Sequence, residues 1–178
     1  MHLPIRPLTR QHVRLFDDHF FRHKAESGRG DYHFMPFAPG DAEGPRGLDA
    51  RLLALPLDAP GWQRWWVAWS ADERSIVGHL NLKGDHLKTG LHRCELGVGI
   101  ERAYRAHGLG KRLMEQAIDF CRAAPSLVWL DLRVFGHNTN ARGLYTTLGF
   151  VEVGVLADRF RIGGEQIDDV IMTLDVGD

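Results

Sequence analysis

The sequence predicts an α/β fold with one mixed, mostly antiparallel and twisted sheet of about six to seven strands flanked by helices. Two observations predict it. Short runs rich in β-branched and aromatic residues alternate with segments whose apolar residues recur three and four positions apart. The resulting order is strand, helix, loops, three antiparallel strands, helix, strand, helix and two strands. A chain of 178 residues suits a single domain over residues 1–178.

The N-terminal segment predicts a short edge strand followed by a helix. Residues 3–8 are apolar and contain prolines, which cannot donate to a central ladder. Residues 10–24 follow with helical spacing, and Thr9 is a candidate N-cap. The predicted buried face of this helix consists of Val13, Phe16, Phe20 and Phe21.

A loop and a hairpin follow. Residues 27–61 are rich in glycine and proline and hold one short helical candidate at 48–55. Two strand-like runs, 64–69 and 75–84, are separated by turn-forming residues, so they predict an antiparallel hairpin. The next strand is predicted at 92–100. Its alternation places Cys94, Leu96, Val98 and Ile100 on one face and Arg93, Glu95, Gly97 and Gly99 on the other.

The C-terminal half continues with an amphipathic helix over residues 110–124 and a strand over residues 127–134. A shorter helix over residues 138–149 is predicted to end at Gly149, a typical position for a glycine with positive φ. Two final strands are predicted at 150–156 and 166–176, on either side of Gly163 and Gly164.

Charge and cysteine content narrow the classes of function. The chain has 22 Lys and Arg against 23 Asp and Glu, so no general basic field attracts nucleic acid or an anionic membrane. Cys94 and Cys121 lie in apolar segments without CxxC spacing, which favours buried thiols in a reducing compartment. No apolar stretch approaches the length of a membrane span, so we expect a soluble, cytoplasmic protein.

The stretch YRAHGLGKRL, residues 104–113, joins a strand to a helix through two glycines. Such a helix start presents free backbone N–H groups to an anion, and glycines allow a phosphate to approach closely. A tight turn without a ligand would need the same glycines. The ATP-binding pattern GxxxxGK[ST] does not fit, because Arg105 and Arg112 occupy its glycine and hydroxyl positions, and the dinucleotide fingerprint fits as poorly.

The pattern R-x-x-G-x-G at residues 105–110 resembles the GNAT superfamily of N-acetyltransferases. The surrounding ELGVGIERAYRAHGLGKRLM (95–114) and the later NTNARGLYTTLGFVEVG (138–154) resemble two family motifs in the expected order, and together they span about a third of the chain. Residues 149–174 also resemble, faintly, the ribosomal-protein acetyltransferase branch. The resemblance implies a GNAT-like fold.

The resemblance implies acetyl-CoA as cosubstrate and no metal. The backbone from Arg105 to Lys111 would hold the pyrophosphate, and the pantetheine arm would pair with the strand around Val98, whose N–H would polarise the thioester carbonyl. The resemblance also implies a bulge or splay that opens a slot for this arm, which Gly97 and Gly99 would permit, unless these glycines merely relieve twist. The implied cofactor-binding residues are Val98, Ile100, Arg105, His107, Gly108, Leu109, Gly110, Lys111, Asn138 and Tyr145.

Acetyl transfer requires a neutral amine, and therefore a base. Glu95, acting through a water, is the first candidate, and its alternative is a surface carboxylate paired with Arg93. His92, His79 or a water chain are the other candidate bases. The resemblance makes Tyr145 the general acid for the leaving thiolate, with core packing as the alternative.

Several other residues have two interpretations. Asn138 fits a CoA contact or an N-cap. His19 and His23 lie four apart, which suits a metal or, far more often, a solvated helix face. Glu26 and Asp31 could hold a cationic acceptor or belong to a solvated loop without a function. Sheet core or an acceptor-pocket wall are the alternatives for Trp62, Trp65, Trp66 and Trp69.

The sequence therefore predicts an enzyme that transfers an acetyl group from acetyl-CoA to a primary amine by direct attack in a ternary complex. The alternative is a non-catalytic CoA-binding sensor or interaction module. A DNA-binding helix pair is disfavoured because the chain lacks a basic face. The acceptor stays open between a small molecule and a protein N-terminus, as does an acyl group larger than acetyl, and the resemblance allows a homodimer.

Overall fold

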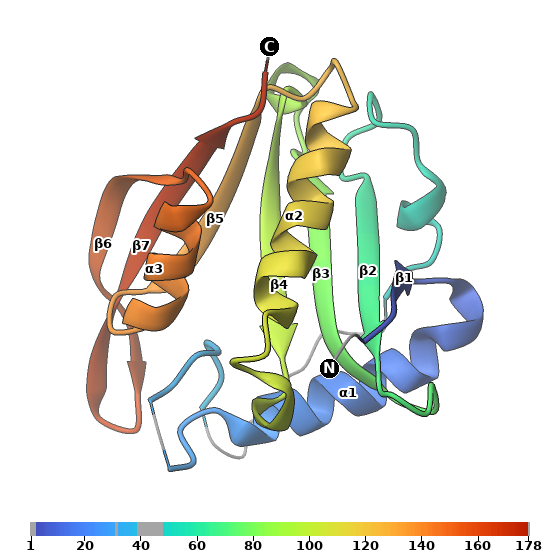
Figure 1. The fold of residues 1–178 in the computed structure, drawn as a ribbon. Coiled ribbons are helices and arrows are strands. Elements are labelled where there is room, and N and C mark those ends of the chain that lie inside the picture. The colour runs from blue at the N-terminus through green and yellow to red at the C-terminus, as the bar shows by residue number, and fades with distance from the viewer. Residues whose placement is uncertain (1–2, 31, 39–47, 178) are drawn as a thin grey trace.

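The computed structural model describes residues 3–30, 32–38 and 48–177. The strands in these residues form one sheet in the order β1-β2-β3-β4-β5-β7-β6 (Figure 1). Only β4 and β5 pair in parallel among the described strands, so the predicted mixed and mostly antiparallel sheet is confirmed. The strands are β1 (Ile5–Pro7), β2 (Gln63–Trp69), β3 (Ile76–Gly84), β4 (Arg93–Ile100), β5 (Trp129–Phe135), β6 (Val151–Ile162) and β7 (Glu165–Asp175).

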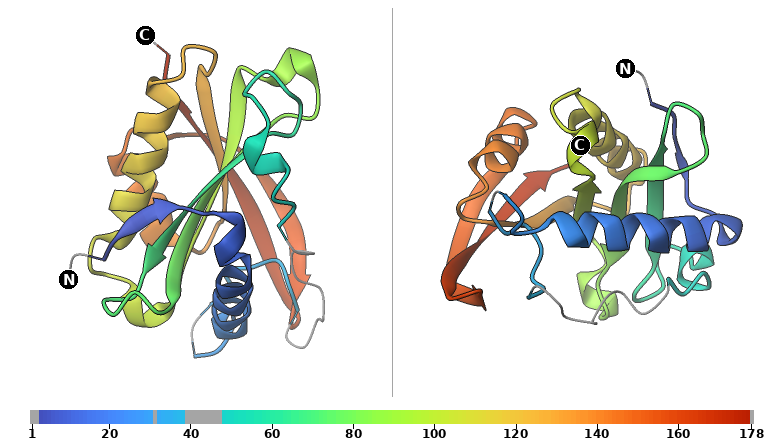
Figure 2. Two further views of the ribbon diagram at one scale, coloured as in Figure 1. Left: turned by 90° about the vertical axis from the view of Figure 1, so that its right-hand side faces the viewer. Right: turned by 90° about the horizontal axis from the view of Figure 1, so that it is seen from below.

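Helices cover both faces of the sheet. Figure 2 shows α1 (Val13–Glu26) crossing one face, whereas α2 (Leu109–Arg122) and α3 (Thr139–Thr147) lie on the other. No helix in the described ranges is long and apolar enough to cross a bilayer. The main core lies between α2, α3 and the sheet, and its fully buried members include Leu80, Leu82, Leu113, Met114, Leu130, Leu132 and Phe150.

The helix α1 differs from its prediction in its cap and in its buried face. The Thr9 hydroxyl lies 3.0 Å from His12 Nδ1 and caps no backbone N–H. A 3-10 turn at Arg10–His12 precedes the helix. Phe21 is 56% exposed, so its predicted place on the buried face is wrong. Because residues three, four and seven apart share a helical face, the face set by Phe16 and Phe20 also holds the two histidines of α1. The buried residues of α1 are Phe16, His19, Phe20 and His23.

The remaining predicted elements agree with the structure, apart from one loop segment and β6, which continues to Ile162 instead of ending near residue 156. The edge position of β1, the β2–β3 hairpin and the positive φ of Gly149 are confirmed, and Gly163 and Gly164 in the turn between β6 and β7 also have positive φ. The helical candidate at 48–55 is a single 3-10 turn at Leu52–Ala54. Trp62, Trp66 and Trp69 are buried, as core residues should be. Cys94 and Cys121 are buried free thiols whose sulfurs lie 3.7 Å apart.

The strands β4 and β5 separate half-way along their length, which Figure 1 shows as a widening gap towards the arrowhead of β4. Their pairing runs from Arg93 opposite Trp129 to Leu96 opposite Leu132, and both strands continue beyond it. On its other side β4 stays in regular register with β3 as far as Ile100, so of the two expected irregularities, a bulge or a splay, the structure has the splay. The second half of β4 therefore has one strand neighbour instead of two.

Candidate active site

The backbone of β4 turns free hydrogen-bonding groups into the gap. The carbonyl of His92 accepts from Trp129 on the β5 side, whereas Glu101 N donates to Val77 O of β3. Because the backbone groups of successive strand residues point alternately to the two neighbours, the even-numbered residues of β4 face β5. The N–H and C=O of Val98 and the N–H of Ile100 thus point towards the gap, beyond the last β4–β5 pair.

The loop after β4 leads into the N-terminus of α2. Gly108 has φ +76° and lies before Leu109, the first residue of the helix, with no described atom within 4 Å of a Cβ placed on it. Ala106 also has a positive φ, +61°, a strained conformation that is enriched at ligand sites. The first helical hydrogen bond is Arg112 N to Gly108 O. The N–H groups of residues 109–111 therefore have no partner within the helix.

Some side chains around the loop before α2 are exposed to solvent and others are buried in the core. His107 and Lys111 are exposed, and the Lys111 ammonium lies 3.5 Å from Glu115 one turn later. Leu109 is buried under the sheet. A Cβ on Gly110 would lie 3.4 Å from Leu144 Cδ2 and 3.5 Å from Ile100 Cδ1, so this glycine permits close packing of α2 against α3 and β4. An open helix N-terminus with a glycine cap and nearby cations fits a pyrophosphate.

The Arg105 side chain turns away from solvent and closes the end of β4. Its Nε donates to the Ile100 carbonyl at 2.9 Å, and its guanidinium lies 4.4 Å from the centre of the Phe34 ring. Glu26 lies 3.4 Å from Arg105 Nη2 and also accepts from the Arg102 N–H at 2.8 Å. The carboxylate that the sequence suggested for a cationic acceptor is thus already ion-paired. Asp31, the other such candidate, lies outside the described residues.

Tyr145 and Asn138 belong to the two ends of α3. Tyr145 is 7% exposed, and burial raises the pKa of its phenol to about 12, so it stays protonated at neutral pH. Asn138 caps the helix, since its Oδ1 accepts from Ala141 N at 3.2 Å. The same oxygen accepts from the hydroxyl of Tyr32 at 3.0 Å. The N-cap interpretation of Asn138 is correct, and a CoA contact would come in addition to it.

The segment after α1 joins this end of α3, a contact that sequence reasoning missed. His137 Nε2 lies 2.6 Å from the carbonyl of His33, next to the bond between Tyr32 and Asn138. Phe34, under the Arg105 guanidinium, ties the same segment to the end of β4. The segment therefore contacts both sides of the gap. No local sequence signal could reveal it, because the partners lie more than a hundred positions apart.

Glu95 is exposed on the face of the sheet that α1 partly covers, and its neighbours in register are Lys83 and Asp131. The alternative pairing of Glu95 with Arg93 is wrong. Arg93 binds Asp131 instead, with Nε at 2.8 Å from Oδ2 and Nη2 at 2.6 Å from Oδ1. His92 is exposed at the opposite end of β4, about 13 Å along the strand from Leu96, which places it away from the gap.

His79 lies at the open end, where it forms a buried cluster with residues of α1. The histidine cluster consists of His19, His23 and His79 together with Glu101. His19 Nε2 lies 2.8 Å from His79 Nδ1, and His19 Nδ1 lies 2.8 Å from Glu101 Oε1. His19 and His23 therefore do not form a solvated helix face. Within the described parts of the chain, no three His, Cys, Asp or Glu side chains are arranged to hold a metal ion.

The pKa values in this cluster follow from burial and hydrogen bonding. Burial lowers the pKa of His23 to about 3, with the proximity of His19 and Arg105 adding to the effect. Burial, then His19 and His23, hold the pKa of His79 well below its usual range. Burial alone would raise the pKa of Glu101, but hydrogen bonds from His19 and Arg22 outweigh it and lower that pKa. At neutral pH, Glu101 is a carboxylate, and His23 and His79 are neutral.

The chain, with its separated strands β4 and β5 beside the glycine-capped helix α2, is similar to known proteins. The model of the "Acetyltransferase (GNAT) family" matches residues 32–150, about two thirds of the chain. The chain belongs to this family. The match confirms the resemblance inferred from the two motifs, and it covers β4, the loop before α2, and α3.

Individual relatives of this GNAT protein agree with the assignment. N-alpha-acetyltransferase RimI of Mycobacterium tuberculosis is 35% identical over 81 residues, which cover 46% of this chain and 48% of that protein. The chain thus spans about half the length of that relative. An acetyltransferase of the GNAT family from Streptococcus pneumoniae has a TM-score of 0.82 at 24% identity, covering 99% of this chain and 100% of that chain.

A further structural neighbour was solved with acetyl-CoA. The GNAT superfamily phosphinothricin acetyltransferase (Pat) from Sinorhizobium meliloti, in complex with AcCoA, has a TM-score of 0.76 at 18% identity and covers 99% of this chain and 90% of that chain. At these identities the two neighbours show the fold alone. They share with this chain the framework on which that protein binds its cosubstrate.

Proposed function

We propose that residues 1–178 act as one N-acetyltransferase domain that moves an acetyl group from acetyl-CoA to a primary amine, by direct attack in a ternary complex. The observation that supports this most is the end of β4–β5 pairing at Leu96, which leaves the Val98 backbone free beside the N-terminus of α2. Membership of the GNAT acetyltransferase family supports the same chemistry.

The residues present fit acetyl-CoA, which supplies the acetyl group as an activated thioester when bound. The backbone from Arg105 to Lys111 would hold the pyrophosphate, since the N–H groups at the start of α2 need acceptors. The free edge of β4 at Val98 and Ile100 would pair with the pantetheine amides as an added strand does. The N–H of Val98 would polarise the thioester carbonyl. Asn138 would add a side-chain contact from the start of α3.

Two side chains would move protons. Glu95 would accept a proton from the attacking amine through a water, because it is exposed on the strand that presents Val98. Tyr145 would protonate the leaving sulfur, and its pKa of about 12 keeps the required proton on the phenol at any physiological pH. Because a thiol has a pKa near ~8.5, the thiolate leaves without full protonation, and the Tyr145 contribution should be moderate.

The acceptor is a primary amine, and the names of two relatives suggest two classes of molecule that bear it. The mycobacterial relative is named an N-alpha-acetyltransferase, and the Sinorhizobium neighbour a phosphinothricin acetyltransferase. These names point to a peptide N-terminus and to a small amino acid, respectively. Both present an amine that is largely protonated at neutral pH, so both need the base described above.

The test combines binding with turnover. Acetyl-CoA binding is measured by titration calorimetry, and free thiol is followed with a panel of N-terminal peptides, free amino acids, phosphinothricin, a polyamine and an aminoglycoside. We expect tight binding and thiol release with at least one amine, and about tenfold slower release for Tyr145→Phe. Tight binding without thiol release would favour the CoA-binding module instead. Absence of binding would refute both functions.

A further inference from the structure

The side chain of Asn81 reaches from β3 across β4 at the point where the gap begins. Asn81 is opposite Gly97 in register, and a Cβ placed at Gly97 would lie 2.6 Å from Asn81 Oδ1, against 3.5 Å from its Cγ and 3.7 Å from its Nδ2. The carbonyl oxygen is therefore the atom of this amide that lies closest to β4. Gly97 stands between Leu96, which ends the pairing with β5, and Val98, whose N–H faces the gap.

The Asn81 amide has hydrogen-bonding capacity that the protein leaves unused. No residue in the described parts of the chain donates to its Oδ1 or accepts from its Nδ2. Asn81 is half-buried, and its polar atoms are not among the described buried atoms that lack a partner, so they keep contact with solvent. An oxygen that can accept two hydrogen bonds is thus available to a ligand beside the gap.

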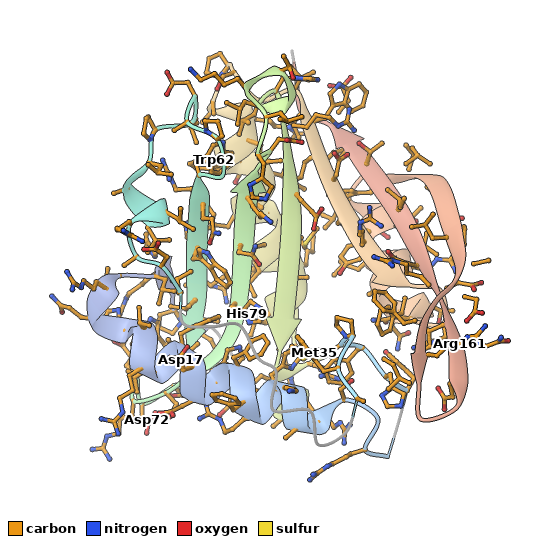
Figure 3. All side chains as sticks on the ribbon, turned by 180° about the vertical axis from the view of Figure 1, so that it is seen from behind. Asp17, Met35, Trp62, Asp72, His79 and Arg161 are labelled. Atoms are coloured by element: carbon orange, nitrogen blue, oxygen red, sulfur yellow. The ribbon has the colours of Figure 1, made fainter. Side chains whose placement is uncertain are left out.

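The face of the sheet that bears Asn81 and Glu95 is the one from which an acceptor would reach the gap. Figure 3 shows this face, with His79 of β3 beside α1, and Asn81 is two residues further along the same side of β3. Glu95 is exposed and Gly97 partly so. The helix α2 lies on the opposite face. Acetyl-CoA, held at the start of α2, would therefore enter the gap from that face, and the acceptor from the face of Asn81.

The Asn81 oxygen lies within reach of the reacting atoms. Three covalent bonds separate a Cβ at Gly97 from Val98 N, so Asn81 Oδ1 is at most about 7 Å from that nitrogen. The Val98 N–H would hold the thioester oxygen at about 3 Å, and an attacking nitrogen approaches the carbonyl carbon to about 3 Å. Glu95 is the diagonal neighbour of Asn81, about 7 Å away, which leaves room for one bridging water.

We infer that Asn81 binds the acceptor through a hydrogen bond from the attacking nitrogen to its Oδ1, and that this bond selects primary over secondary amines. The inference rests on the proposed function. The nitrogen becomes positively charged as it bonds to the acetyl carbon, so its hydrogen bond to a carbonyl oxygen strengthens in the transition state. An amide keeps this accepting oxygen at every physiological pH, because it does not titrate there.

The selectivity follows from the number of protons on the nitrogen. A neutral primary amine attacks with two N–H groups while the N–C bond forms, and the C–S bond then breaks. One proton passes through the water to Glu95, and the other, donated to Asn81, stays on the nitrogen as the N–H of the product amide. Tyr145 protonates the sulfur, after which Glu95 releases a proton to water and Tyr145 regains one. A secondary amine has a single N–H, which Glu95 must remove, so Asn81 Oδ1 loses its donor.

Three variants separate this role from packing. Asn81→Leu removes the hydrogen bond without making room for a larger acceptor, because the two side chains have the same branching and similar size. Asn81→Asp keeps an accepting oxygen at the same place. Lys83→Leu is the matched control, because Lys83 lies on the same strand and face, opposite Glu95, where β4 and β5 are still paired.

The assay compares the best amine of the panel with the same molecule methylated on the reacting nitrogen. The wild type should prefer the primary amine at least about tenfold in kcat/KM. Asn81→Leu should lower kcat/KM about 10- to 100-fold for the primary amine and less than about threefold for the methylated one. Asn81→Asp and Lys83→Leu should keep the wild-type preference, and KM for acetyl-CoA should not change in any variant.

The acetylated products test the same hydrogen bond without turnover. The product of the primary amine keeps the N–H that Asn81 would hold, and the product of the methylated amine has none. Titration calorimetry in the presence of CoA should show that Asn81→Leu raises the Kd of the first product about tenfold and leaves the Kd of the second unchanged.

Equal losses with both amines in Asn81→Leu would indicate structural damage and overturn the inference, as would an unchanged preference. A preference in Asn81→Asp as low as in Asn81→Leu would also overturn it, because the accepting oxygen is then not what selects the amine. If the wild type binds acetyl-CoA but acetylates no amine, the proposed function itself fails, and this inference fails with it.

Discussion

Gly99 shows at the scale of one residue how closely the histidine cluster approaches β4. A Cβ at this position would lie 2.4 Å from His79 Cε1 and 2.7 Å from His23 Nε2, and both rings are buried. Gly99→Ala should therefore lower the free energy of unfolding by about 1–3 kcal/mol, as overpacking does. Urea unfolding measures this change.

The matched control is Gly143→Ala on the exposed side of α3, where a Cβ meets no described atom within 4 Å. Alanine is the better helix former, so this variant should gain up to about 1 kcal/mol. Equal stability of Gly99→Ala and wild type would mean that the two rings can move aside.

Single residues also mark where sequence reasoning succeeded and where it could not. The alternation of β4 predicted that Glu95 and Gly99 share a face, because strand periodicity is a local property. Helical spacing, read from Val13 and three phenylalanines, left His19 and His23 on a solvated face. Their burial depends on Glu101 and His79, which lie about 60 to 80 positions away and give no local signal.

At the scale of an element, the start of α2 combines a left-handed glycine with open space. Gly108→Asp places a carboxylate where the backbone N–H groups would bind the pyrophosphate, and a short side chain at φ +76° costs only about 1 kcal/mol. We expect acetyl-CoA affinity, measured by titration calorimetry, to fall at least about 100-fold while the melting temperature changes little.

The control for this variant is Gly164→Asp in the β6–β7 turn. Gly164 has φ +87°, and a Cβ added there would meet no described atom within 4 Å, so the backbone strain and the added charge are alike. Its acetyl-CoA affinity should equal that of the wild type. Unchanged acetyl-CoA affinity in Gly108→Asp would mean that the loop before α2 only connects a strand to a helix and does not bind the pyrophosphate.

The family resemblance implied a bulge or splay at β4, but the place where β4 and β5 separate could not be read from the residues of the strand. The glycines Gly97 and Gly99 would have permitted either form, but the register with β3 is regular, and these glycines make room for Asn81 and His79 on that strand. The gap arises where pairing with β5 stops, at Leu96 and Leu132. Leu96 and Val98 are both aliphatic residues on the same face of β4. The sequence therefore does not mark the residue at which pairing with β5 ends.

Across the whole molecule, the sheet separates two environments. The face under α2 and α3 is a continuous apolar core, which local periodicity predicted in nearly every strand and helix. The other face carries buried histidines under α1 and exposed polar residues such as Glu95 beyond it. The family motifs located the cofactor loop, whereas the polar face depends on contacts between distant segments and needed the structure.

This polar interior should make the whole fold sensitive to acid. The pKa of His23 is about 3 in the folded protein against 6.5 in the unfolded chain, so between these values the unfolded state binds a proton that the native state does not. The lowered pKa of His79 acts in the same direction, and that of Glu101 does so at still lower pH. Each such histidine lowers the free energy of unfolding by about 1.4 kcal/mol per pH unit as the pH falls below about 6.5.

Urea unfolding between about pH 7 and pH 4 should therefore show a steep loss of stability, provided that unfolding stays two-state. His23→Gln removes one of these protons, so its slope should be smaller by about 1.4 kcal/mol per pH unit whatever its stability at neutral pH. If the free energies of unfolding of His23→Gln and wild type fell in parallel with pH, His23 would be protonated in the folded protein. The buried cluster on α1 would then hold a positive charge, which burial should strongly disfavour.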